Sequence, residues 1–279
     1  MIAADLAARR AAFRALHREG CFVIPNPWDI GTGRYLRTLG FKALATTSAG
    51  LAFSRGLPDS PLALSRDIVL AHTAEIASAT DLPVNADFQS GYAADAEGVA
   101  ESVRLCVATG VAGLSIEDST GEPDRPLYEL AEAVDRVRSA RAAIDASGGG
   151  VLLTARAECC LVGHPDPLRE SIRRLLAYAD AGADVLFAPG LRTREEIRAI
   201  VGAAAPRPVN ILMSASTGLR VADLAELGVR RVSVGSALAR AAWAGLMRAA
   251  GPIAAEGSFE GLGAAAPFAD LNALFGGRA

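Results

Sequence analysis

Acidic side chains stand where apolar segments of this chain end, and their type and placement could support metal or acid–base chemistry. Asp87 follows the apolar run 82–86 and precedes a turn at Gly91, Glu117 ends a similar run, and Asp59 lies in a loop with Gly56. A carboxylate at a strand end is held rigidly yet stays open to solvent, which suits a ligand or catalytic acid. For Asp87 alone, a turn or helix cap is the plainer interpretation. Three such acids at one place would repel each other unless a cation lay among them.

The donor types indicate which cation this would be. Carboxylate oxygens without a histidine cluster suit Mg²⁺, with Mn²⁺ as the second choice. The three histidines show no metal-ligand spacing, so we expect them to be structural or at the surface. Arg156 ends a further apolar run and could hold an anionic substrate beside the metal, because arginine is the natural bidentate partner of a carboxylate. The alternative is that Arg156 only forms salt bridges with Glu158 or Glu117.

The lysine content excludes one mechanism. Lys42 is the only lysine in the chain. Schiff-base chemistry needs an amine that can lose its proton, and arginine cannot supply one. Lys42 precedes its predicted strand and would face away from the chemistry of a barrel. An imine-forming aldolase is therefore not expected.

A recurring unit positions these residues. Glycine or proline precedes each of several apolar runs, as a helix C-terminal residue or as the first residue of a strand. Continuous apolar strands that alternate with amphipathic helices indicate a parallel sheet covered on both faces. Eight units in about 250 residues favour a closed barrel over an open sheet. The predicted strands lie near residues 21–24, 41–47, 83–87, 111–117, 151–155, 183–187, 208–213 and 229–234.

The predicted fold class is α/β, a single (β/α)8 TIM-type barrel domain over residues 1–279 with a C-terminal helical tail. No interdomain linker is evident. The tail, residues 251–279, is rich in Ala and Gly but carries apolar residues, so we expect it to pack on the barrel or on a neighbouring subunit. The predicted helices cover residues 65–79, 95–108, 126–145, 166–180, 193–204, 220–227 and 236–250.

In such a barrel the strand ends form one rim, where distant residues meet. The small residues Ser48, Ala49 and Gly50 could cradle a carboxylate or phosphate with their backbone N–H groups. The following strands bring Asp87, Glu117 and Arg156 to this rim, and a later strand brings Asn210. Gly235 and Ser236 resemble the glycine loop of phosphate-binding barrels, which would suit a sugar-phosphate isomerase or synthase.

Six motifs in this order resemble the isocitrate lyase/phosphoenolpyruvate mutase superfamily, over roughly residues 10–250. The resemblance implies a Mg²⁺-dependent barrel that makes or breaks C–C or P–C bonds of 2-oxo acids or their 2-hydroxy adducts through a pyruvate enolate. Family members are commonly tetramers that exchange their last helix. The motifs are Thr47-Ser48-Ala49-Gly50, Gly56-Leu57-Pro58-Asp59, Asp87-Phe88-Gln89-Ser90-Gly91-Tyr92, Ser115-Ile116-Glu117-Asp118, Ala155-Arg156-Ala157-Glu158 and Val209-Asn210.

The resemblance also implies roles. Asp87 looks like the acid that touches the metal directly, and Asp59 and Glu117 look like ligands that act mainly through water. Ser48, Ala49 and Gly50 look like the carboxylate cradle. Arg156 looks like the substrate clamp and, with Glu117, a catalytic residue, and Asn210 looks like a contact to the far end of the substrate.

Two departures from the family pattern narrow the reaction. Gln89 stands where a second acid is common. Between Ile116 and Leu127 there is no Cys, His or Lys, so the Lys-Lys-Cys-Gly-His motif of the lyases and the gating-loop lysine of the mutases and hydrolases are both missing. Cys159 and Cys160, adjacent at a strand end, are expected to pack rather than to act as nucleophiles.

The predicted function is a lyase resembling oxaloacetate decarboxylase, because metal-assisted loss of CO2 requires the fewest catalytic side chains. One alternative is a C–C lyase of the methylisocitrate or dimethylmalate type that uses a different base, such as Tyr92 or Glu158. A phosphonopyruvate P–C hydrolase, a phosphate-binding barrel isomerase and a non-catalytic barrel are the others.

Composition limits the partners. The chain has 28 Lys+Arg against 31 Asp+Glu, a net charge of -3, so no basic field for nucleic acid is evident. Its four cysteines show no disulfide framework, and neither a targeting signal nor a membrane span is expected. We expect a cytoplasmic protein with a small carboxylate substrate and, by resemblance, a homotetramer.

Overall fold

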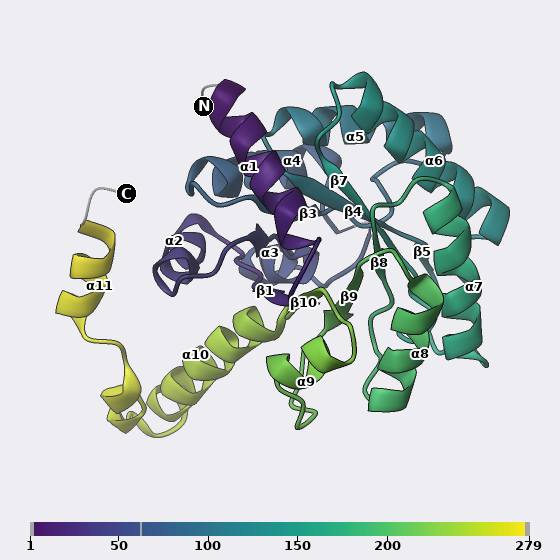
Figure 1. The fold of residues 1–279 in the computed structure, drawn as a ribbon. Helices are drawn as coiled ribbons and strands as arrows, with labels where there is room; N and C mark the ends of the chain where they lie inside the picture. Colours follow the sequence, from purple (N-terminus) through teal and green to yellow (C-terminus); the bar gives the residue numbers. More distant parts are fainter. Residues whose placement is uncertain (1–2, 62, 277–279) are drawn as a thin grey trace.

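Eight parallel strands form the centre of the computed structural model, which describes residues 3–61 and 63–276. They make a nearly closed barrel surrounded by helices, which confirms the predicted (β/α)8 fold class (Figure 1). The strand order around the barrel is β1-β10-β9-β8-β7-β4-β3-β2. The strands are β1 (Phe22–Ile24), β2 (Leu44–Ala45), β3 (Val84–Asp87), β4 (Gly113–Glu117), β7 (Leu152–Arg156), β8 (Val185–Phe187), β9 (Val209–Leu212) and β10 (Arg231–Ser233).

The gap between β1 and β2 is bridged by hydrogen bonds that lie just beyond β1. The Ala45 backbone N–H donates to the Pro25 carbonyl over 3.0 Å. The Asn26 side-chain amide donates to the Thr46 carbonyl over 2.9 Å. The oxygen of the same amide accepts from the backbone N–H groups of Val234 and Gly235, over 3.0 and 2.8 Å. Asn26 therefore connects the end of β10 to the end of β2.

Helices cover the outside of the barrel, and several begin at the side chains that the sequence offers as caps. Asp29, Thr47, Ser65, Asp95 and Thr193 each accept a backbone N–H from the first turn that follows. The helices are α1 (Ala3–Leu16), α2 (Ile30–Thr38), α3 (Ser48–Ser54), α4 (Arg66–Ser78), α5 (Ala96–Ala108), α6 (Leu130–Ala146), α7 (Pro167–Asp180), α8 (Arg194–Ala204), α9 (Val221–Glu226), α10 (Ala237–Glu256), the 3₁₀ helix η1 (Glu260–Ala264) and α11 (Phe268–Gly276).

Two predicted helix boundaries are wrong. The helix expected from residue 126 begins at Leu130, because residues 125–127 form β6 (Arg125–Leu127), which pairs antiparallel with β5 (Ser119–Glu122). This hairpin was not predicted. The helix expected to end at residue 250 continues through Pro252 to Glu256 and ends at the left-handed Gly257.

Beyond α10 the tail turns back toward the N-terminal helices in Figure 1, and the Phe275 ring lies against Gly31 of α2. The last three residues of the predicted tail, and the first two of the predicted domain, lie outside the described residues. No helix within residues 3–61 and 63–276 is both long and apolar enough to cross a membrane.

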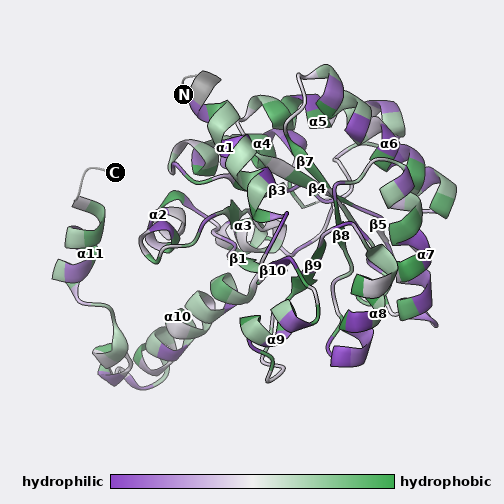
Figure 2. Cartoon of the chain, viewed as in Figure 1, coloured by the Kyte–Doolittle hydropathy of each residue, from purple (hydrophilic) through white to green (hydrophobic). Residues whose placement is uncertain are grey.

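The described residues form one large apolar cluster and two small ones. The strands at the centre of the barrel are largely hydrophobic in Figure 2, and they pack against the inner faces of the helices. At the other end of the barrel from the strand carboxyl ends, α1 contributes Phe13 to a cluster with Ile24 and Leu152. His17 packs edge-to-face on Phe13 and Phe22 there.

His17 predicts an acid sensitivity of the fold. Burial, with a further contribution from Arg231, lowers the pKa of His17 from 6.5 to about 3. Because the unfolded state then binds the extra proton, stability from neutral His17 is complete above pH 6.5 and is lost as the pH falls from 6.5 toward 3. From pH 6 to pH 4 this residue is expected to cost about 1.4 kcal/mol of unfolding free energy per pH unit. Urea unfolding at several pH values gives the unfolding free energy of the wild type and of His17→Gln. The slope of this free energy against pH should be steeper for the wild type, and equal slopes would contradict the assignment.

A candidate active site at the carboxyl ends of the strands

A cavity of about 370 Å³ opens where the barrel strands end. Six of the eight predicted site residues line it, which are Ser48, Ala49, Asp59, Asp87, Arg156 and Asn210. Glu117 lies behind Arg156, and Gly50 lies below the surface, where a Cβ atom would come within 2.9 Å of Trp28 Cβ. The structure therefore brings the predicted rim residues together, and their roles remain predictions.

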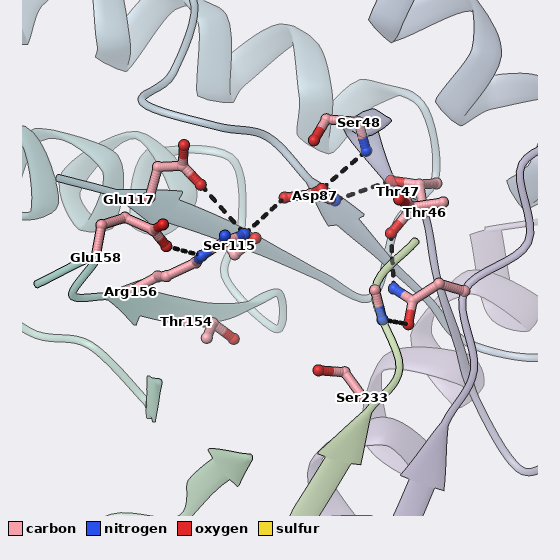
Figure 3. A network of polar contacts seen from close by, with 12 residues as sticks. Thr46, Thr47, Ser48, Asp87, Ser115, Glu117, Thr154, Arg156, Glu158 and Ser233 are labelled. Carbon is pink, nitrogen blue, oxygen red and sulfur yellow. Dashed lines mark hydrogen bonds and ion pairs between the residues drawn. The ribbon is translucent and has the colours of Figure 1, made fainter. Parts of the chain in front are cut away.

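Arg156 lies at the centre of the acidic residues (Figure 3). One of its terminal nitrogens, Nη1, is 3.2 Å from Glu117 Oε2 and 3.6 Å from Asp87 Oδ1. Its Nε donates to Glu158 Oε1. The simple salt-bridge interpretation of Arg156 is thus present in the geometry, and it involves three carboxylates rather than one.

One guanidinium does not offset the negative charge around it. Burial raises the pKa of Glu117 well above its ordinary value; Arg156 opposes this rise, and repulsion from Glu158 and Asp87 adds to it. The pKa of Asp59 is also raised, by burial and then by Asp87. The carboxylates in turn raise the pKa of Arg156 although burial alone would lower it. The site therefore favours uptake of a further positive charge, either a proton or a cation.

The donor set fits a hard divalent cation on chemical grounds. Asp59, Asp87 and Glu117 supply carboxylate oxygens to one region that carries excess negative charge, and such oxygens are what Mg²⁺ and Mn²⁺ prefer. In the part of the chain that the structure describes, no three His, Cys, Asp or Glu side chains already stand in a metal-holding arrangement. The reason is visible in the ion pairs, because Asp87 and Glu117 both turn toward Arg156. Asp87 and Glu117, with Asp59, would hold a cation beside the Arg156 guanidinium.

The predicted carboxylate cradle is partly engaged already. Thr47 caps α3, and its hydroxyl accepts the Gly50 N–H over 3.2 Å. The Ser48 N–H donates to Asp87 Oδ2 over 2.8 Å. The Ser48 N–H therefore orients the Asp87 carboxylate and the Gly50 N–H stabilises the start of α3, so neither is free to bind a ligand.

The segment after Asp87 has an unusual backbone that the sequence did not indicate. Gln89 has φ 43° and Tyr92 has φ 52°, values in the left-handed region that few non-glycine residues adopt. Such conformations concentrate at functional sites, where the surrounding contacts maintain them. Gln89, which replaces the expected second acid, is buried, and its backbone carbonyl accepts the Glu117 N–H over 2.9 Å. This backbone bond joins the segment after β3 to the end of β4.

Asp118 is only 2% exposed and contacts Glu158, one of the three carboxylates around Arg156. Its Oδ1 accepts the Glu158 N–H over 2.8 Å, and its Oδ2 accepts from Arg174 over 3.1 Å and from the Tyr178 hydroxyl over 2.6 Å. Because Glu158 in turn holds Arg156, these bonds place the centre of the acidic group.

Replacing Asp118 by Asn is expected to destabilise the fold by roughly 2–4 kcal/mol, because it leaves the buried Arg174 without its full counter-charge. The melting temperature measures the loss, which corresponds to about 2–4 °C per kcal/mol for a chain near this size. Asp135→Asn is the matched control, since the Asp135 side chain is 61% exposed and pairs with Arg138 at the surface. Equal melting temperatures for both variants would contradict the buried role.

Polar residues that were not among the predicted site residues lie beside Asn210, and two of them, Arg231 and Ser233, line the cavity. Thr154, Arg231 and Ser233 are buried on the inner face of β7 and β10, next to Asn210. A period-two alternation could have revealed them, since Arg231 and Ser233 alternate with Val232 and Val234. Barrel interiors are usually filled by branched apolar side chains, so a polar layer at this position is unusual.

Two alternatives lose support from local geometry. The Val234 and Gly235 amides are both bound to Asn26, so the glycine loop does not present them to a phosphate. Burial raises the pKa of Cys159 to about 11, which keeps its thiol protonated and agrees with a packing role. Lys42 is exposed and precedes β2, as the exclusion of imine chemistry required.

Comparisons with known proteins agree with this geometry. The family model for phosphoenolpyruvate phosphomutase matches residues 13–254. An uncharacterized protein of Mycobacterium tuberculosis is 34% identical over 94% of this chain and 95% of its own length. An oxaloacetate decarboxylase of Rhodopseudomonas palustris is 32% identical over 81% of this chain and 77% of its own. A 2-methylisocitrate lyase of Escherichia coli is 32% identical over 63% of this chain and 60% of its own.

Solved structures extend the likeness to the whole chain. A Burkholderia cenocepacia J2315 protein, provisionally described as a lyase or mutase, superimposes with a TM-score of 0.93, at 48% identity over 98% of each chain. Oxaloacetate acetylhydrolase in complex with oxalate superimposes with a TM-score of 0.85, at 26% identity over 96% of this chain and 94% of its own.

Proposed function

This chain belongs to the phosphoenolpyruvate phosphomutase family, within a superfamily of lyases and mutases, and we propose that it is a divalent-cation-dependent C–C lyase that resembles oxaloacetate decarboxylase. The proposed reaction breaks the bond between C3 and the C4 carboxylate of oxaloacetate. The electron pair passes into the enolate of pyruvate, CO2 leaves, and water supplies the proton to C3.

One observation carries this proposal. Among the described residues that line the cavity, the only titratable side chains are two acids and three arginines, which are Asp59, Asp87, Arg156, Arg231 and Arg240. Cleavage of a 2-hydroxy acid needs a base to remove the hydroxyl proton, whereas decarboxylation needs no such base. The hairpin of β5 and β6 occupies the segment where the lyase motif would stand, and no Cys, His or Lys lies in it.

The side chains have separate tasks in this proposal. Asp87, Asp59 and Glu117 would hold Mg²⁺ or Mn²⁺, and the chemistry that such an ion supplies when bound is polarisation of the 2-oxo group. Ser48 keeps Asp87 in place through its backbone N–H. Arg156 holds the acids together and offers its remaining N–H groups to the negative charge that develops on the substrate.

The C–C lyase of the methylisocitrate or dimethylmalate type is the second candidate, with support from the 2-methylisocitrate lyase likeness. Tyr92, one of the bases considered for it, has a buried hydroxyl without a hydrogen-bond partner in the described structure. Burial and the charges of Asp87 and Glu117 raise the pKa of Tyr92, so it stays protonated at neutral pH. Tyr92 therefore holds its proton and is not suited to act as the base of this cleavage.

Pyruvate release from a panel of substrates tests the proposal. Oxaloacetate, methylisocitrate, dimethylmalate and phosphonopyruvate are incubated with the protein and Mg²⁺ in a coupled assay. We expect pyruvate from oxaloacetate above the rate of heat-inactivated protein, which corrects for spontaneous decarboxylation. No pyruvate above this background from any substrate would refute the lyase assignment.

A homotetramer is part of the same proposal. The α10 helix leaves large apolar side chains exposed, among them Trp243, Leu246 and Met247. The resemblance to a family that exchanges its last helix suggests that a second copy covers them. Sedimentation analysis should then find about four times the chain mass of 28.7 kDa.

A further inference from the structure

Arg136 is a buried arginine of α6 that contacts the segment behind the candidate cation site. α5 and α6 lie side by side on the outside of the barrel (Figure 1), and the Arg136 side chain is only 1% exposed. Its guanidinium reaches residues 90–94, which connect Asp87 at the end of β3 to α5. In the part of the chain that the structure describes, its hydrogen-bond partners are all neutral oxygens. The geometry therefore indicates a role toward this segment rather than toward an acid.

Three backbone carbonyls converge on the guanidinium. Its Nη2 donates to the Ala93 carbonyl over 2.6 Å and to the Ser90 carbonyl over 3.2 Å. Its Nη1 donates to the Ala94 carbonyl over 3.1 Å. Carbonyl oxygens that point at one place repel each other, and a buried carbonyl without a donor is costly. The positive guanidinium removes both costs, so it stabilises this course of the backbone over others.

The bound segment follows a turn with an unfavourable backbone conformation. Gln89 (φ 43°) and Tyr92 (φ 52°) are left-handed although neither is a glycine. Within the turn, the Gly91 N–H donates to the Phe88 carbonyl over 2.9 Å. Strained residues persist only where their surroundings fix them, so contacts from outside the turn must add to this bond. The bonds that Arg136 donates to the segment are such contacts.

The same turn connects the two strand ends that carry the acids. The backbone carbonyl of Gln89 accepts the Glu117 N–H over 2.9 Å. The Asp87 carboxylate is held separately, because it accepts the Ser48 N–H over 2.8 Å. A change in the backbone at Gln89 would therefore move Glu117 relative to Asp87. Arg136 stands close to this link, because it binds the carbonyl of the next residue along the chain.

Tyr128, between β6 and α6, fixes the guanidinium on its other side. The Tyr128 hydroxyl accepts from Nη2 of Arg136 over 3.1 Å, and the guanidinium carbon lies 4.1 Å from the centroid of the ring. Tyr128 is itself held, since its N–H donates to the Asp118 carbonyl and its carbonyl accepts from Arg174, both over 2.9 Å. A planar guanidinium can meet an aromatic face and several acceptors at once, which a lysine ammonium cannot.

We propose that Arg136 is a positioning residue of the cation site. It holds residues 90–94 so that the turn before them keeps Glu117 beside Asp87. Arg136 does not line the cavity, and it acts through the backbone of this segment. The inference rests on the proposed function in one respect, which is that Asp87 and Glu117 hold a divalent cation.

Binding of Mn²⁺ alone tests this role without the reaction. Arg136→Met keeps the length of the side chain but removes its charge and its donors. Mn²⁺ titration, followed by electron paramagnetic resonance, should show an affinity about 10- to 100-fold lower than that of the wild type, the range for residues that orient metal ligands. Val137→Ala is the matched control, because Val137 is the next residue of α6, is 2% exposed and packs in the apolar core. The control should destabilise the fold yet keep Mn²⁺ affinity within about twofold.

Amide hydrogen exchange gives a local readout of the same two variants. Arg136→Met should speed exchange in residues 88–95 by about tenfold or more, and exchange of the Glu117 N–H should also rise, because both depend on the conformation of the turn. Val137→Ala should leave this segment as it is in the wild type. If Arg136 only supports the packing of α6, both variants bind Mn²⁺ equally at the same folded fraction and exchange alike in residues 88–95. That result overturns the inference.

Two milder variants keep the test decisive if Arg136→Met folds poorly. Arg136→Lys keeps the charge but cannot contact three carbonyls and the Tyr128 hydroxyl together, so Mn²⁺ affinity should fall by only about 3- to 10-fold. Tyr128→Phe keeps the ring and removes one acceptor, and a loss of about 2- to 3-fold is expected. Wild-type Mn²⁺ affinity and wild-type exchange of residues 88–95 in both variants would refute the role.

The two proposals fail differently. If oxaloacetate is not turned over but Arg136→Met still lowers Mn²⁺ affinity, only the proposed reaction is wrong. If oxaloacetate is turned over and Arg136→Met matches Val137→Ala in Mn²⁺ affinity and in exchange, only the role of Arg136 is wrong.

Discussion

Asp87→Asn is expected to reduce the rate of pyruvate release from oxaloacetate by roughly 10²- to 10³-fold, the range found when one preorganised electrostatic group is removed. Asn keeps the size of the side chain and an oxygen for the Ser48 N–H, so the local fold should persist. What it removes is the negative charge at the end of β3 that faces both the cavity and Arg156. Steady-state kinetics measure the rate, and Mn²⁺ titration gives a second readout, with affinity expected to fall more than about tenfold.

Asp67→Asn provides the matched control for this variant. Its carboxylate is 87% exposed on α4 and lies 3.7 Å from Arg66 Nε. The control should keep both activity and Mn²⁺ affinity. An Asp87→Asn protein that matched the control in both measurements would remove Asp87 from the proposed site.

Arg156→Gln is expected to lower kcat by about 10²- to 10³-fold, since it removes the single positive charge among three carboxylates. Arg156 lowers the pKa of Glu117 and Glu158 against the effect of burial, so its loss should raise both values further. Those acids would then take up protons at neutral pH, and the activity that remains should increase as the pH rises. Rate measurements between pH 6 and pH 9 test this direction.

Arg156→Lys separates charge from shape. Lysine keeps the positive charge but loses the planar fork that contacts several carboxylates at once. We expect an activity between those of the wild type and of Arg156→Gln. Arg173→Gln serves as the surface control, because Arg173 is 57% exposed and pairs with Glu170. Full activity in Arg156→Gln would show that the arginine is a structural salt-bridge partner only.

The strands could be predicted because their signals are local. The signal is a glycine that ends a helix, followed directly by an apolar run. Gly40 and Gly182 are two such glycines, and each has a left-handed φ in the structure. The hairpin of β5 and β6 was missed because its strands are short, polar and half exposed, so no apolar period marks them. The hairpin forms by antiparallel backbone pairing, with Ser119 opposite Leu127 and Glu122 opposite Arg125, and not by burial of an apolar face.

The sequence by itself determined the barrel and the presence of acids, Arg156 and Asn210 at its strand ends, because the topology sends every such end to one rim. Only the tertiary structure decided which arginine lies among carboxylates and which lies among neutral groups. Arg156 is surrounded by carboxylates from β3, β4 and the segment after β7, whereas Arg231 lies among neutral acceptors from β7, β9 and the turn after α1. In the sequence the two arginines look alike, each at an apolar run. The difference comes from strand register across the barrel, which sets the partners that each guanidinium can reach.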